Sequence, residues 1–127
     1  MDKDIIIRFK EPGTLRYFTA GDYFEENGQY IIDIAKQVNP YHSALIAIHE
    51  LCEFLLINRR GIPEPTILQY DLQWEKDKQE GIAKSDEPGN EANCIYKEEH
   101  RIAETIERLM ALYLGIDWFE YEKSLKY

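Results

Sequence analysis

The chain is poor in cysteine and in basic residues, and both shortages exclude classes of protein. Its two cysteines, Cys52 and Cys94, form no CxxC motif, so they build neither a zinc knuckle nor a disulfide framework. Lys and Arg together number 15 against 24 Asp and Glu, for a net charge of −9. Binding to nucleic-acid phosphates or to an anionic membrane needs clustered cations. We therefore expect no nucleic-acid partner and no membrane partner.

Targeting and membrane-spanning segments are absent from the sequence as well. No apolar run approaches the roughly 18 residues of a membrane span. The N-terminal stretch MDKDIIIRFK lacks the apolar core and the cleavage site of a signal peptide. Both absences predict a cytoplasmic protein. A length of 127 residues with 44% hydrophobic content is enough for one domain with a packed core.

Strands are expected before helices along the chain. Three short segments rich in β-branched and aromatic residues predict strands: 5–9, 15–19 and 30–35. Residues 20–29 are interpreted as a loop that holds the turn dipeptide Asn27-Gly28. We therefore expect a small antiparallel sheet within a β-rich region, 1–36.

The rest of the chain, 39–127, is expected to be mainly helical. Capping residues, apolar periodicity and Gly or Pro stops predict helices over four segments: 39–58, about 63–79, 96–114 and 117–125. The polar segment 80–93 contains two glycines and a proline, which predicts a long, mobile loop. Strands followed by helices indicate a single α+β domain over 1–127.

The segment 44–57, ALIAIHELCEFLLI, places three polar residues in an otherwise apolar helix. At about 100° per residue, apolar side chains flank His49 and Glu53 on both sides, so this helix is expected to be buried. A buried carboxylate is costly unless a partner or a metal ion stabilises it. His49 and Glu53 therefore predict either a hydrogen-bonded pair or a metal site.

The spacing of these residues is that of a metal-binding motif. Residues at i and i+4 lie on one face of a helix, and HExxH helices hold zinc through two such histidines. Here the pentapeptide is HExxE, and the Glu53 carboxylate is a ligand type that zinc accepts. Glu50 points to the side of His49 and is placed to act as general base toward a metal-activated water. The motif thus predicts a Zn²⁺ site with Glu50 as its catalytic residue.

A strand, a helix with His-Glu-x-x-ligand and a later helix with a further ligand together resemble the zincin metallopeptidases, in particular their minimal gluzincin-like members. The resemblance covers residues 30–57, with a weaker match at 96–114. The chain is also similar to small uncharacterised bacterial and phage-encoded proteins with the pattern HELxE … EH. The resemblance implies a zincin-like fold, bound zinc and hydrolysis of a peptide or protein. Glu53 stands where the family has its second motif histidine.

The resemblance also implies a histidine as the third ligand. Gluzincin-like sites resemble a set of two histidines and one glutamate, so with Glu53 in place the missing ligand is His100. The helical wheel of the last long helix predicts a core face made of its apolar residues, Ile102, Ile106, Leu109 and Tyr113. His100 points away from that face, whereas Glu99 lies closer to it, so Glu99 and Glu104 are rival ligands. Three interpretations of Asp71 stay open: a solvated residue on a helix surface, a partner that orients the ring of His49, or a fourth metal ligand.

Two other functions stay open from the sequence. The segments Glu50-x-x-Glu53 and Glu104-x-x-Glu107 are typical of all-α nucleotide pyrophosphohydrolases that hold Mg²⁺, although the β-rich first third argues against that architecture. A non-catalytic domain of phage or mobile-element origin would instead keep the polar residues of the buried helix as a hydrogen-bonded cluster or a structural metal site.

Overall fold

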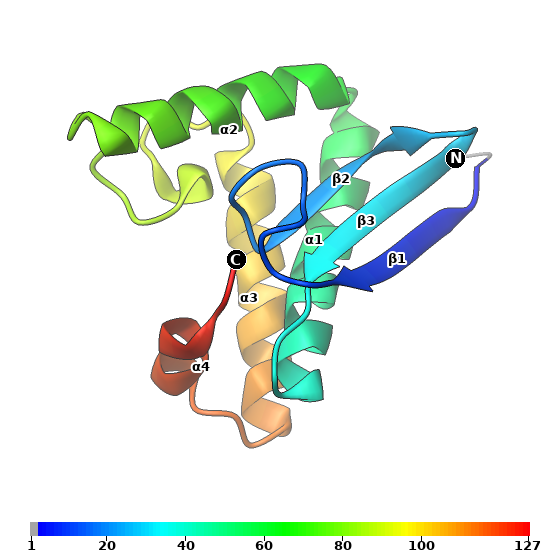
Figure 1. The fold of residues 1–127 in the computed structure, drawn as a ribbon, viewed down its shortest axis with the longest axis vertical. Helices are drawn as coiled ribbons and strands as arrows, with labels where there is room; N and C mark the ends of the chain where they lie inside the picture. Colours follow the sequence, from blue (N-terminus) through cyan, green and yellow to red (C-terminus); the bar gives the residue numbers. More distant parts are fainter. Residues whose placement is uncertain (1–2) are drawn as a thin grey trace.

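The computed structural model describes residues 3–127, and the fold is α+β, as predicted. Within this range three strands precede four α-helices and one short 3₁₀ helix (Figure 1). The strands are β1 (Ile5–Lys10), β2 (Gly21–Glu26) and β3 (Gln29–Ala35). The helices are α1 (Pro40–Arg60), α2 (Glu64–Gln79), η1 (Pro88–Asn90), α3 (Lys97–Tyr113) and α4 (Trp118–Ser124). The four predicted helices are confirmed, as are the first and third strands. Residues 1 and 2 of the expected β-rich region lie outside the described range.

The sheet differs from the expected one in its pairing. β3 is the central strand, with β2 antiparallel and β1 parallel to it, so the sheet is mixed rather than antiparallel throughout. The strand expected over 15–19 is wrong, because these residues form bends, and β2 lies in the segment that was expected to be a loop. The turn at Asn27-Gly28, with φ values of 52° and 75°, joins β2 to β3 as a two-residue hairpin.

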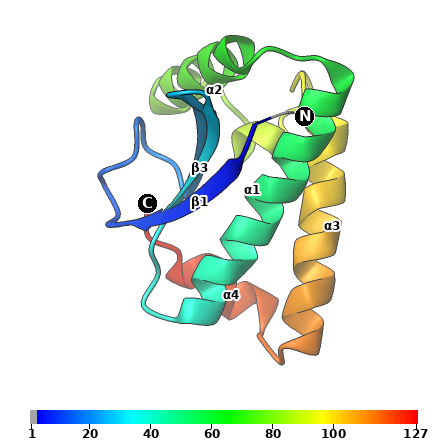
Figure 2. The ribbon, with the colours of Figure 1, turned by 90° about the vertical axis from the view of Figure 1, so that its right-hand side faces the viewer.

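α1 lies between the sheet and α3, which accounts for its apolar sequence (Figure 2). The side chain of Asn39 caps the helix by accepting a hydrogen bond from the backbone N–H of Tyr41. Gly61 ends it in the left-handed conformation, with φ 79°. Leu45 and Ile57 on α1 are fully buried. Apolar as it is, α1 cannot cross a membrane, and neither can any other helix within residues 3–127.

α3 buries a polar face, contrary to the prediction from its helical wheel. Ile106, Leu109 and Tyr113, which were expected in the core, are 39%, 56% and 82% exposed. The residues that α3 buries are instead Glu99, His100, Ala103, Glu107 and Ala111. The predicted core face of this helix is therefore wrong, and His100 lies on the face that is buried. Small alanines between the polar residues allow α3 to pack closely against α1.

Substitutions on opposite sides of α3 test this orientation. Ala103→Leu is expected to destabilise the protein by about 1–3 kcal/mol, because added methyl groups overpack a closed interface. Leu109→Gln is the matched control on the exposed side, and its free energy of unfolding is expected to change by less than about 0.5 kcal/mol. Urea unfolding of both variants measures the difference. A larger loss for Leu109→Gln than for Ala103→Leu would contradict the assigned face.

The segment 80–93, expected to be a mobile loop, is irregular and internally bonded. It contains η1 and otherwise turns, bends and irregular backbone. The carboxylate of Glu91 accepts hydrogen bonds from the Trp74 indole N–H at 3.1 Å and from the Lys84 backbone N–H at 2.7 Å. These bonds tie the segment to α2. As a result, Glu87 is brought to the interior site described below.

Candidate metal centre

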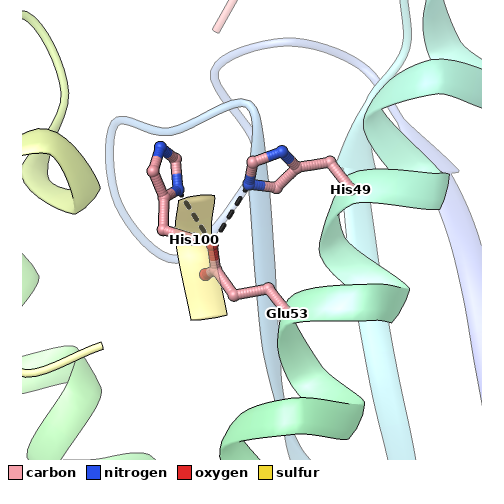
Figure 3. A group of neighbouring side chains, drawn as sticks. All are labelled: His49, Glu53 and His100. Atoms are coloured by element: carbon pink, nitrogen blue, oxygen red, sulfur yellow. Dashed lines mark hydrogen bonds and ion pairs between the residues drawn. The ribbon is translucent and has the colours of Figure 1, made fainter. Parts of the chain in front are cut away.

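Three side chains from two helices meet between α1 and α3 (Figure 3). His49 and Glu53 lie one turn apart on α1, and His100 comes from the first turn of α3. Glu53 Oε2 lies 3.1 Å from His49 Nε2 and 3.0 Å from His100 Nδ1. One ligand atom from each residue lies within 4.8 Å of the other two. The fold thus brings together the three residues that the sequence motif and the resemblance named as metal ligands.

A carboxylate also faces the second ring nitrogen of each histidine. Glu107 Oε1 lies 2.8 Å from His49 Nδ1, and Glu107 accepts a further hydrogen bond from Tyr121 Oη at 2.5 Å. Glu87 Oε2 lies 3.6 Å from His100 Nε2, which is an ion-pair distance longer than a hydrogen bond. A metal-bound histidine commonly has such a carboxylate, which fixes its tautomer and its ring orientation.

The buried charges of this site shift one another's pKa. Burial opposes ionisation of Glu53, but hydrogen bonds from His100 and His49 outweigh it and lower the pKa of Glu53 to about 2. Burial also opposes the charged form of His100, yet its contacts with Glu53 and Glu87 raise the pKa to about 10. For His49, burial is again outweighed, here by Glu107 and Glu53, and the pKa lies well above its usual value. These contacts favour the protonated form of both rings, which stabilises the carboxylates around them.

The same donor atoms fit a divalent transition-metal ion. Zinc binds imidazole nitrogen at about 2.0–2.1 Å and carboxylate oxygen at about 2.0–2.2 Å, usually in tetrahedral geometry. Neighbouring ligand atoms on such an ion are roughly 3.3 Å apart, a few tenths of an ångström more than the separations from Glu53 Oε2. Two imidazoles and one carboxylate suit zinc and also other first-row ions. The residues His49, Glu53 and His100 can therefore hold a metal ion after small displacements.

Two residues that the sequence offered as further ligands have other partners. Glu99 is buried, and its carboxylate pairs with Arg60 at 3.1 Å. Asp71 accepts hydrogen bonds from the phenols of Tyr17 at 2.7 Å and Tyr96 at 2.5 Å. Burial raises the pKa of Asp71 to about 6 against the effect of these bonds. Both residues therefore stand outside the three-residue group, although Asp71 lines the same cavity.

The site opens into a cavity of about 610 Å³. Its walls come from α1, α2, α3, β2, the segment between β1 and β2, and the turn at η1. His49, Glu53 and His100 lie at its wall together with Glu50. A volume of this size is typical of sites that bind a small molecule or a short segment of a larger one.

Glu50 lies beside Gly21 of β2 and faces this cavity. A Cβ atom at position 21 would overlap the Glu50 side chain, so strand and helix approach this closely only because the residue is glycine. Burial and the nearby Glu53 carboxylate raise the pKa of Glu50 to about 8. A carboxyl group with a pKa near neutrality is suited to accept and return a proton.

The contact between Gly21 and Glu50 can be measured through stability. Gly21→Ala is expected to destabilise the protein by about 1–3 kcal/mol, because the new methyl group displaces a packed side chain. The matched control is the same change in a Glu50→Ala background, where the overlap is removed and the loss is expected to be smaller. Urea unfolding of the four proteins gives the coupling energy. Strictly additive effects would show that the two residues do not touch.

Three residues of the site were not assigned to it from the sequence: Glu87, Glu107 and Tyr121. Glu107 carried a usable signal, because it follows His100 by seven residues and so shares its helix face. Glu87 lies in an irregular segment, where spacing does not predict position. Tyr121 lies on a separate short helix and carried no signal. Glu104, named as a rival ligand, belongs to a second group with Glu87 and His100.

Comparison with known proteins identifies no relative of this chain. No protein-family model, curated protein or solved structure matches the chain. The resemblance to the zincins therefore stays a prediction, and function is argued from the geometry of the site.

Proposed function

We propose that the protein is a metal-dependent hydrolase with a zincin-like fold that cleaves a peptide or protein substrate in the cytoplasm. Its metal centre consists of His49, Glu53 and His100, with zinc as the expected ion, and Glu50 is its general base. The convergence of three ligand atoms in a cavity that also holds a carboxyl group of raised pKa supports this proposal most strongly.

Each residue of the centre has a separate task in this proposal. When bound, a divalent ion supplies Lewis acidity, which polarises a carbonyl group and lowers the pKa of water. Glu107 keeps the His49 ring oriented with Nε2 toward Glu53. Glu50 takes a proton from the attacking water and returns it to the leaving amine.

The charges that line the cavity favour a neutral acyl substrate over a phosphate ester. Its lining holds more carboxyl groups, among them Glu64, Asp71 and Glu75, than basic side chains, which are Arg16 and Lys78, and this excess disfavours an anionic substrate. Arg16 is also at the wall, but it is already paired with Asp22 at 2.7 Å and with Glu64 at 2.6 Å. The three-stranded sheet is a further argument against the all-α pyrophosphohydrolase alternative.

Zinc-dependent proteolysis tests the proposal. Metal-free protein is mixed with one equivalent of Zn²⁺ and with an unstructured protein such as casein, and the products are identified by mass spectrometry. Cleavage is expected to require zinc, to stop with 1,10-phenanthroline and to be lost in His49→Gln. His42→Gln is the matched control, because His42 lies on the same helix and bonds Ser124 instead. A wild-type protein that binds no zinc would remove the proposal.

The hydrogen-bonded state of the site supports a second function, that of a non-catalytic domain. His49 and His100 already pair with three carboxylates without an ion, so the cluster can serve stability alone. In that case wild-type protein cleaves nothing with or without zinc, and His49→Gln lowers the melting temperature in zinc-free buffer.

A further inference from the structure

His100 has one ring nitrogen that no hydrogen bond uses. Its Nδ1 faces Glu53 at 3.0 Å, whereas Nε2 is buried and has no hydrogen-bond partner within residues 3–127. The whole residue is 6% exposed. Buried polar atoms without a partner are rare in folded proteins. Nε2 therefore has Glu87 at ion-pair distance but no hydrogen bond, which leaves it available to a group from outside the chain.

Two carboxylates stand beside this nitrogen. Glu87 Oε2 lies 3.6 Å from Nε2, which is beyond hydrogen-bond range. Glu104, one turn after His100 on α3, supplies the third atom of a group in which all atoms lie within 4.8 Å of one another. Ligand atoms that share a cation at about 2.0–2.2 Å are roughly 3–4 Å apart. The 3.6 Å between Glu87 and His100 falls in this range, and Glu104 offers an oxygen within 4.8 Å of the other two ligand atoms, so small displacements would let the three residues share a cation.

The turn at η1 is shaped around the His100 ring. A Cβ atom at Gly89 would overlap the imidazole, so the backbone reaches the ring only because this residue is glycine. The phenol of Tyr70 donates a hydrogen bond to the Pro88 carbonyl at 2.9 Å and fixes the same turn to α2. Glu87, which directly precedes this turn, is thereby held beside Nε2 of His100.

We propose that Glu87, His100 Nε2 and Glu104 form a second site, the outer site, for a divalent transition-metal ion such as Zn²⁺ or Mn²⁺. One imidazole nitrogen and two carboxylate oxygens are donors that these ions accept. The carboxylates balance the charge of the cation, and Nε2 releases its proton to solvent as the ion binds. When the inner site, which also uses His49 and Glu53, is filled as well, His100 bridges two ions as an imidazolate.

The outer site differs from the inner one in exposure and in role. The side chains of Glu87 and Glu104 are 38% and 23% exposed, against 8% for Glu53, so the outer ion exchanges more freely with solvent. Two ions bridged by one imidazole stand about 6 Å apart, beyond the roughly 3.5–4 Å of two-metal catalysis. The outer ion therefore joins the η1 turn to α3 and does not act on substrate. This inference goes beyond the proposed hydrolase and does not need its activity.

Calorimetric titration of metal-free protein with zinc chloride tests the outer site. Wild type is expected to bind two equivalents, the outer one with lower affinity. Glu104→Gln should keep only the tighter equivalent, whereas Glu53→Gln should keep only the weaker one. Glu98→Gln is the matched control, because it removes the same charge from the first turn of α3, where Glu98 pairs with Arg101 instead, and it should leave both equivalents in place.

The outcomes separate this site from the proposed hydrolase. A single wild-type equivalent that Glu104→Gln leaves unchanged overturns the outer site and leaves the hydrolase intact. If wild type binds one equivalent that is lost in Glu104→Gln but kept in Glu53→Gln, the zinc occupies the outer site. That result supports the outer site and overturns the inner centre. Circular dichroism checks the fold of each variant. If Glu104→Gln does not fold, Glu87→Gln provides the same test from a different segment.

Discussion

The Glu50→Gln variant is expected to lose hydrolytic activity by roughly 10²- to 10⁴-fold while it keeps its zinc, because glutamine cannot accept a proton. The amide has nearly the same shape as the carboxyl group, so the contact with Gly21 is preserved. A cation at the neighbouring ligands lowers the pKa of Glu50 from about 8, which leaves a carboxylate available near neutral pH. Initial rates of peptide cleavage and zinc content are measured on the same preparation.

A matched substitution shows whether a carboxyl group is needed at position 50 or merely in the cavity. Asp71→Asn removes a carboxylate that lines the same cavity and whose oxygens are bonded to two phenols. This variant is also expected to keep its zinc, and its rate of hydrolysis is expected to fall less than that of the Glu50 variant. Full activity of Glu50→Gln would assign proton transfer to another group and remove Glu50 from the mechanism.

Zinc binding at the inner site near pH 7 is expected to release about two protons per ion, one from each histidine. The pKa of His100 is raised to about 10, and that of His49 lies well above its usual value, so both rings hold a proton that the metal must displace. Because these pKa values are raised, the apparent affinity increases with pH by roughly 100-fold per unit below them. Calorimetry in buffers of different ionisation enthalpy counts the protons.

The proton count is best measured in the Glu104→Gln background, where the outer site is disabled and only the inner ion contributes. A site made of neutral histidines with ordinary pKa values near 6.5 would release less than one proton at pH 7.5. A binding enthalpy that does not depend on the buffer would mean that neither ring is protonated. That result would contradict the ion-paired state described for the metal-free site.

The central helix was predictable because the sequence shows charged side chains whose burial is costly. His49, Glu50 and Glu53 lie among apolar residues, and burial of such groups requires partners. That requirement alone marked them as a site, and Asn39 and Gly61 marked the ends of the helix. The partners themselves lie on other elements, so they could be proposed only through a resemblance or, as with Glu87, not at all.

The second strand was missed because its residues have low strand propensity. β2 reads GDYFEE, and Gly, Asp and Glu are all depleted in strands. Tertiary contacts decide its structure. Asp22 is buried with Arg16, bonded through both carboxylate oxygens at 2.7 and 2.9 Å, and Gly21 makes room for Glu50. The Asn27-Gly28 dipeptide was the better guide, because a two-residue hairpin requires strands on both sides.

The face of α3 was predicted wrongly because periodicity assumes that apolar residues point inward. Here α1 presents charged partners instead, and the carboxylate of Glu107 and the imidazole of His100 pair with them. The apolar stripe and the buried face lie roughly 120° apart around the helix axis, from the 3.6-residue period. No pattern within one segment reveals what the opposing helix presents.

This orientation of α3 has a consequence for how the chain reaches its folded state. In an early collapse, Ile106 and Leu109 are the residues that α3 would bury first, since apolar contact needs no precise geometry. The native arrangement requires the helix to turn about its axis until His100 meets Glu53. We therefore expect a competing compact state, which the charged cluster and the small buried residues Ala103 and Ala111 disfavour. Zinc added during refolding is expected to increase the folding rate, because it binds only when α3 is rotated so that His100 faces Glu53.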